Sequence, residues 1–192
     1  MMLSVLLIAP ALAQSGPADP GSSYGAEASV SYMVGTLIGP WPEPGLHGTL
    51  LARYDAFIAG SESAGPRLGA SLWGSTAAWP LQHAVESEEA TEDFGYTHAG
   101  VMALVRYDPQ APVAGTFGFG FSRLDLVNYW GGPLALPMLS FEAGIRRPLA
   151  ANAIVDLQAR AHWSTARSGI DSTALEEWWL VQLGLSLGWR LH

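Results

Sequence analysis

Hydrophobic and polar residues alternate along most of the chain, most clearly in its last fifteen residues. There one face would carry Trp179, Val181, Leu183, Leu185, Leu187, Trp189 and Leu191, and the other Gln182, Gly184, Ser186, Gly188, Arg190 and His192. A two-residue period predicts a β-strand. A continuous apolar row of this length is typical of a strand that crosses a membrane, which needs about 9 to 11 residues with one face toward lipid.

The same alternation recurs throughout the chain and predicts eight strands. They span residues 26–38, 46–59, 66–79, 95–108, 114–130, 136–147, 150–165 and 177–192. An even number of strands, with short and longer connections in turn, predicts an all-β fold, an eight-stranded antiparallel up-and-down transmembrane β-barrel over residues 24–192. We expect the short turns and both termini to be periplasmic. A break in the alternation near Ser122, Arg123 and Leu124 predicts a β-bulge in the fifth strand.

The two faces differ in chemistry. We expect the apolar face to contact lipid, with Leu50, Val101, Phe119, Phe141, Leu157, Leu183, Leu185 and Leu187 as its clearest members. The opposite face collects the charged residues, which predicts an interior charge network of Glu27, Arg53, Asp55, Arg67, Arg106, Glu142, Arg146, Asp156, Arg160 and Arg190. His47, His98 and His162 fall on this inner face as well.

Specific partners can be predicted within this network. Closure of a barrel pairs its first strand with its last, so we expect Glu27 beside Arg190. Asp55 with Arg67 is a further candidate pair. Glu142 or Asp156 could pair with Arg146 or Arg160, because an arginine fork suits a carboxylate.

Alternation alone does not distinguish inside from outside, since a soluble lipocalin-like ligand-binding barrel has the reverse arrangement. Aromatic residues near the strand ends favour a membrane barrel over a soluble one. Trp41, Trp79, Tyr96, Trp130, Trp163 and Trp179 would form one interfacial girdle, and Tyr54, Tyr107 and Trp189 the other.

Composition supports a membrane barrel. Of the 192 residues, 49% are hydrophobic and only 14% charged, yet no apolar run approaches the roughly 20 residues of a spanning helix. Residues 1–13 have an apolar core and end in Ala11-Leu12-Ala13, which predicts a signal peptide. No Lys or Arg precedes Arg53, so either the true start lies upstream or targeting is weak. Residues 14–23 would be a flexible lead-in.

Charge and cysteine content exclude several functions. A net charge of −8 argues against a nucleic-acid partner, and the absence of cysteine excludes disulfides and thiolate metal sites. The histidines are scattered without metal-ligand spacing, so we predict no metal site and no cofactor. Five acids in one predicted loop favour a solvated loop, with divalent ions bridging to lipopolysaccharide as the alternative; these are Glu86, Glu88, Glu89, Glu92 and Asp93.

The whole pattern over residues 24–192 resembles the small OmpA-like and OmpX-like outer-membrane barrels of Gram-negative bacteria. In the last strand, Gln182, Gly184, Leu187 and Trp189 are similar to the insertion signal that such barrels present to the barrel assembly machinery. The resemblance implies a cell outer membrane location, with lipid and lipopolysaccharide as surroundings.

A second, local resemblance is to the outer-membrane lipid A deacylases, which show His-x-Ser-Asn on a late strand and a Glu some twelve residues on. The matching positions are His162, Ser164, Thr165 and Glu176, and Thr165 stands where that family has Asn. The resemblance implies Ser164 as nucleophile, His162 as base and Glu176 as the acid that orients it. An interior polar pair without catalytic function is the alternative interpretation, and we favour it because the alternation turns His162 and Ser164 inward.

The sequence therefore predicts a non-enzymatic outer-membrane barrel with an envelope structural or surface-interaction role, whose loops could contact an extracellular partner. An eight-stranded barrel is only wide enough for its own side chains, so we do not expect a general porin. The alternatives are a lipid A or phospholipid acyl hydrolase and a soluble ligand-binding barrel.

Overall fold

The computed structural model describes residues 25–39, 46–60, 66–80, 95–107, 113–127, 134–150, 152–166 and 175–191. These residues form eight strands and no helix. The predicted signal peptide, the lead-in, the five loop acids, Trp41 and Trp130 lie outside them. Within the described part, no helix is long and apolar enough to span a membrane.

The strands follow the alternating segments of the sequence closely. They are β1 (Gly25–Ile38), β2 (Leu46–Ala59), β3 (Arg67–Pro80), β4 (Gly95–Tyr107), β5 (Ala114–Val127), β6 (Leu134–Pro148), β7 (Ala153–Ala166) and β8 (Glu176–Leu191). The sixth strand begins two residues earlier than predicted, and the predicted residues 128–130 of the fifth strand lie outside the described residues.

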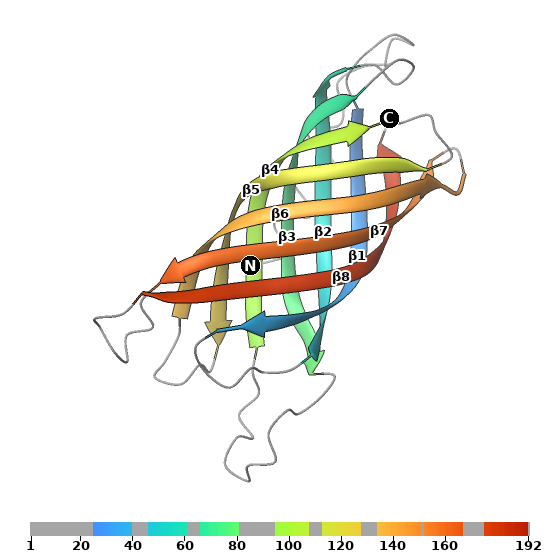
Figure 1. Ribbon diagram of the computed structural model, residues 1–192. Helices are drawn as coiled ribbons and strands as arrows, with labels where there is room; N and C mark the ends of the chain where they lie inside the picture. The colour runs from blue at the N-terminus through green and yellow to red at the C-terminus, as the bar shows by residue number, and fades with distance from the viewer. Residues whose placement is uncertain are drawn as a thin grey trace.

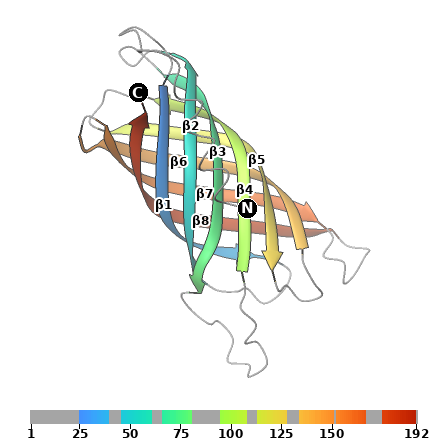
Figure 2. The same ribbon diagram turned by 180° about the vertical axis from the view of Figure 1, so that it is seen from behind.

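Each strand pairs antiparallel with its neighbours in chain order, and β1 pairs with β8, which closes the barrel. The strands wind obliquely around the barrel wall (Figure 1), and the view from behind shows β1 between β2 and β8 (Figure 2). We call the end where β1 begins the turn end, and the opposite end the loop end. At the turn end Gly60, with a φ of 98°, adopts the left-handed conformation that favours glycine.

The sidedness of the barrel agrees with the membrane interpretation. All eight residues named above as the clearest members of the apolar face are exposed on the outer surface. Eight of the ten predicted network residues are buried in the lumen, and Asp156 and Arg190 are partly exposed at the turn end. A soluble lipocalin-like barrel is thus the wrong alternative, because its apolar residues would line the lumen.

One detail of the strand prediction is wrong. The fifth strand has no bulge, since β5 pairs with β4 and β6 in continuous register. The register shifts lie in the pairing of β2 with β3, between Gly48 and Thr49 and between Phe57 and Ala59. Arg123 simply points outward, where it meets Asp125, and Leu124 points into the lumen. The apparent break in alternation comes from a charged pair outside and an apolar residue inside.

The aromatic girdles are also only partly as predicted. Trp163 and Trp179 pack together on the outer surface near the loop end, and Tyr107 and Trp189 are exposed near the turn end. Tyr96 does not belong to the girdle, because its side chain is buried in the lumen. Its position in the alternation, beside inward-facing His98 two residues later, carries this information.

Candidate functional site in the barrel lumen

The inward-facing side chains form layers from the turn end to the loop end. An ion network occupies the turn half; it consists of Glu27, Arg53, Asp55, Arg106, Glu142, Arg146, Asp156, Arg160 and Arg190. Polar and aromatic side chains lie in the middle, and apolar ones at the loop end. Every second residue of each strand contributes to the lumen because of the two-residue period.

One branch of the ion network crosses the lumen. Arg53 on β2 holds Asp55 through Nε at 2.6 Å and Glu142 on β6 through Nη1 at 2.5 Å. Glu142 also binds Nη2 of Arg160 at 2.7 Å. Strands β2 and β6 stand four positions apart around an eight-stranded barrel, so the Arg53–Glu142 pair joins opposite walls. Charge-assisted bonds of this kind hold both walls at a fixed separation.

A second branch is centred on Glu27. Its Oε2 lies 2.9 Å from Nη1 of Arg106 and 2.6 Å from Nη1 of Arg146, and its Oε1 lies 3.9 Å from Nε of Arg190. Glu27 and Arg190 are register partners across the β1–β8 closure, as the sequence predicts. Sequence reasoning missed the cross-lumen contacts of Glu27 with Arg106 and Arg146.

Of the remaining predicted ion pairs, two are present and one is not. Glu142 pairs with Arg160, and Asp156 pairs with Arg146 at 3.1 Å; both are among the proposed combinations. The Asp55–Arg67 pair is wrong, because Asp55 binds Arg53 and lies 3.7 Å from Nη2 of Arg106. The guanidinium of Arg67 instead lies 4.2 Å from the ring centre of Phe57, a cation–π contact.

The middle layer contains a polar cluster, which we define as His98, Ser122, Ser140 and His162. Ser140 donates to Ser122 at 2.7 Å; Nδ1 of His162 lies 2.8 Å from Ser140, and Nε2 of His98 lies 2.8 Å from Ser122. The two imidazole rings meet edge to face at 4.4 Å. All four side chains are buried. Because they come from β4, β5, β6 and β7, their hydrogen bonds connect four neighbouring strands.

Tyr96 organises a second group of polar side chains toward the loop end. Its hydroxyl lies 2.8 Å from Nε2 of His47 and 2.6 Å from Oγ1 of Thr49, and it accepts a bond from Gln182 at 3.2 Å. Because a buried hydroxyl without partners costs free energy, this arrangement explains why a tyrosine is tolerated in the lumen.

Apolar side chains fill the loop end of the lumen. This loop-end cluster consists of Leu37, Tyr96, Leu124, Leu126, Leu136, Met138, Trp178 and Leu180. Its members come from β1, β4, β5, β6 and β8 and are all buried, so the cluster removes a large apolar surface from water.

The candidate catalytic residues lie beside this cluster, because His162 pairs in register with Leu180 and Ser164 with Trp178. His162 and Ser164 both point into the lumen and are buried, so neither faces lipid. Nδ1 of His162 is hydrogen-bonded to Ser140. Oγ of Ser164 has no hydrogen-bond partner among the described residues. Glu176 pairs in register with Ala166, so Ser164 lies between the level of Glu176 and that of His162. A catalytic triad needs the reverse order, with His between the acid and the nucleophile.

The described residues contain no group of three or more His, Asp or Glu side chains that could hold a metal ion. The residues of the insertion signal lie on β8 as two pairs. Gln182 and Gly184 face the lumen, and Leu187 and Trp189 face outward.

Comparison with known proteins identifies the fold. Neisserial surface protein A matches with a TM-score of 0.57 and 13% identity over 87% of this chain and 97% of its own. The N-terminal β-barrel domain of Pseudomonas aeruginosa OprF matches with a TM-score of 0.50 and 9% identity, covering 88% and 98%. The outer membrane enzyme PagL matches with a TM-score of 0.50 and 12% identity, covering 83% and 97%.

The sequence itself matches no protein-family model and no curated protein. The fold and the apolar outer surface define the class: the chain is a small eight-stranded β-barrel of the outer-membrane type.

Proposed function

We propose that this chain is a non-enzymatic protein of the cell outer membrane, in which the barrel is a rigid anchor with an envelope structural or surface-interaction role. The observation that carries the proposal is the filled lumen. Ion pairs that join opposite walls occupy the turn half, and the loop-end cluster occupies the other half. A lumen built in this way favours a scaffold over a channel.

The partners follow from the surfaces. The outward apolar side chains suit acyl chains of lipid and lipopolysaccharide, and the pattern of β8 suits recognition by the barrel assembly machinery. The loops at the loop end are the expected contact surface for an extracellular partner, since variable loops on a rigid scaffold commonly carry recognition.

Location and lumen can be tested together. We expect the protein in the outer-membrane fraction, with a heat-dependent shift in gel mobility that reports a folded barrel. We also expect no stable conductance when the refolded protein is added to a planar lipid bilayer. Recovery in the soluble periplasmic fraction would overturn the location, and steady ion conductance by the wild type would overturn the scaffold role.

Lipid A or phospholipid acyl hydrolysis is the alternative function. It is supported by the spacing of His162, Ser164 and Glu176 and by the fold that the chain shares with the enzyme PagL. The inward direction of His162 and Ser164 and the order of the three residues argue against it.

Mass spectrometry of lipid A from cells that express the wild type, Ser164→Ala or Ser186→Ala separates the two functions. Ser186 is the matched control, because it is another buried lumen serine on a neighbouring strand. We expect the same lipid A in all three strains. Loss of an acyl chain with the wild type and Ser186→Ala, but not with Ser164→Ala, would establish the enzyme instead.

A further inference from the structure

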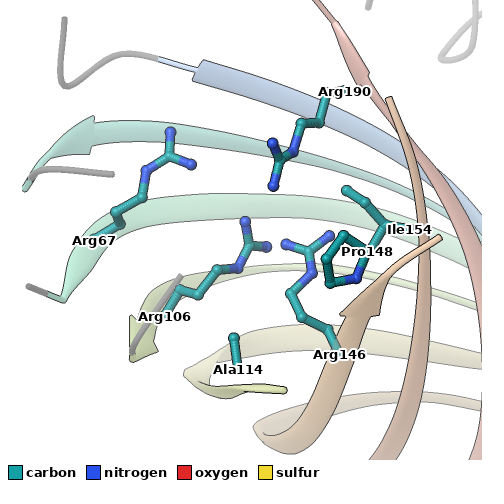
Figure 3. A pocket seen from close by; sticks show the side chains of 7 residues that line it. All are labelled: Arg67, Arg106, Ala114, Arg146, Pro148, Ile154 and Arg190. Carbon is teal, nitrogen blue, oxygen red and sulfur yellow. The ribbon is translucent and has the colours of Figure 1, made fainter. Parts of the chain in front are cut away.

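Arg147 is an exposed cation on the outer surface at the turn end. It follows Arg146 on β6, and successive side chains of a strand point to opposite faces of the wall. Arg146 is buried at the turn end of the lumen (Figure 3), where Glu27 and Asp156 pair with it. No ion pair among the described residues involves Arg147. The charge of Arg147 therefore faces the surroundings of the barrel.

The outer surface around Arg147 is apolar. Ile145, two residues earlier on the same face of β6, is exposed, and Val155 on β7 is the register partner of Arg147. Asp156 follows Val155 but is held by Arg146 at 3.1 Å, so it does not compensate Arg147. An arginine in such a position can lay its aliphatic part on apolar side chains and direct its guanidinium group toward lipid headgroups.

The position of Arg147 along β6 agrees with one edge of a hydrocarbon layer. Arg123 is the second outward arginine of the described residues, and its register partner on β6 is Pro137. From residue 137 to residue 147 the strand advances about 25 Å along the membrane normal, at about 3.3 Å per residue and a tilt of about 40°. The apolar band of outer-membrane barrels is about 25 Å tall. The outward residues in between are all uncharged; they are Leu139, Phe141, Ala143 and Ile145.

The two outward arginines differ in compensation. Nε of Arg123 lies 2.8 Å from Oδ1 of Asp125, so the charge at the loop end is balanced within the protein. Arg147 at the turn end has no such partner among the described residues. A guanidinium group binds phosphate oxygens through charge-assisted hydrogen bonds, often two at a time. A phosphate of the adjacent lipid leaflet is thus the counter-ion that suits Arg147.

We propose that Arg147 is a binding site for the headgroup of an anionic phospholipid in the leaflet at the turn end. Its guanidinium group donates to the phosphate, and Ile145 and Val155 contact the adjoining acyl chains. The inference rests on the proposed membrane location, and it adds the class of lipid that this surface prefers. The apolar neighbours favour a lipid over free phosphate, because they gain nothing from an ion that has no acyl chain.

The test uses native mass spectrometry of the full refolded chain, released from neutral-detergent micelles with equal amounts of phosphatidylglycerol and phosphatidylcholine. One arginine near a membrane surface contributes about 1 kcal/mol to the attraction of anionic lipid, which corresponds to a preference of about fivefold. We expect the wild type to retain phosphatidylglycerol with about this preference. Arg147→Gln should lose most of it, and Arg147→Lys should keep part of it, because lysine has the charge without the planar fork.

Arg123→Gln is the matched control, because it removes an outward arginine whose charge Asp125 already balances. It should keep the full preference, and inorganic phosphate at the concentration of the lipid should not displace phosphatidylglycerol. The proposal is overturned if the wild type retains both lipids equally, if Arg147→Gln keeps the preference, if Arg123→Gln loses it, or if inorganic phosphate displaces the lipid.

A heat-dependent gel shift after refolding into phosphatidylcholine vesicles separates this inference from the proposed location. A barrel that inserts but shows no lipid preference contradicts the lipid site alone. A chain that does not insert overturns both the lipid site and the membrane location.

Discussion

The barrel contains the same short motif in two environments. Arg53-Tyr54-Asp55 on β2 and Arg123-Leu124-Asp125 on β5 each join an arginine Nε to an aspartate Oδ1 two residues later, at 2.6 Å and 2.8 Å. The side chains of the first pair are 2% and 8% exposed, and those of the second are 70% and 43% exposed. The two pairs have similar geometry but lie on opposite faces of the barrel wall, so their contributions to stability should differ.

The difference in exposure between the two pairs shows that charged side chains in the lumen depend on protein partners. Arg53 also binds Glu142 on the opposite wall, and Asp55 lies near Arg106, so the inner pair belongs to a network that water cannot replace. The outer pair near the loop end can exchange its partner for solvent or lipid headgroups. A buried charge needs its partner far more than an exposed one does.

Breaking the inner pair should have the largest effect. Asp55→Asn keeps the size of the side chain but leaves Arg53 and Arg106 with less compensation, so we expect a loss of about 3 to 5 kcal/mol in the free energy of unfolding. Urea unfolding of the refolded barrel, followed by tryptophan fluorescence, measures it. A loss below about 1 kcal/mol would show that the network does not stabilise the fold.

Placing an arginine on the outside without a partner should have the next largest effect. Leu185 lies midway along β8 and faces outward, so Leu185→Arg should cost about 2 to 4 kcal/mol if this surface contacts acyl chains. Leu149→Arg is the control, because Leu149 is exposed in the segment after β6, at the turn end. Equal effects of the two substitutions on unfolding in lipid vesicles would count against a membrane-embedded outer surface.

Removal of one hydroxyl from the lumen tests the polar layer. Tyr96→Phe leaves His47, Thr49 and Gln182 with fewer partners, and we expect a loss of about 1 to 3 kcal/mol. Tyr107→Phe on the same strand removes an outward hydroxyl and should change stability by less than about 0.5 kcal/mol. If both variants unfold at the wild-type urea concentration, the Tyr96 group has no structural role.

Breaking the outer pair should have the smallest effect. Asp125→Asn is the counterpart of Asp55→Asn, and we expect a loss of no more than about 1 kcal/mol, reduced further by salt. The same urea experiment measures both variants. An effect of Asp125→Asn as large as that of Asp55→Asn would remove the distinction between the two faces.

The alternation of polar and apolar residues is sufficient to predict the number of strands, their approximate limits and which face of each strand points outward. It placed Glu27 beside Arg190, because barrel closure brings the first strand to the last. It did not predict the Arg53–Glu142 pair, since contacts across the lumen depend on strand tilt and stagger, which no local pattern encodes.

Errors at individual residues have local causes. Residue type suggests an interfacial aromatic at Tyr96 and a bulge at Arg123, whereas the position of each residue in the two-residue period gives the observed direction of its side chain. The proposed partner of Asp55 was wrong because its nearest cation lies on its own strand, at Arg53. For the catalytic candidates, spacing gave no information on the order along the barrel axis.

Sidedness can be measured directly on two adjacent residues of β8. The chain has no cysteine, so Leu185→Cys and Ser186→Cys each provide one unique site for a spin label. Leu185 is 62% exposed and Ser186 2% exposed. In lipid vesicles we predict that the label at 185 collides readily with oxygen dissolved in the bilayer and little with a water-soluble nickel complex, and that the site at 186 is inaccessible to both. Oxygen accessibility at 186 with protection at 185 would contradict a barrel whose apolar face meets lipid and whose arginines lie in the lumen.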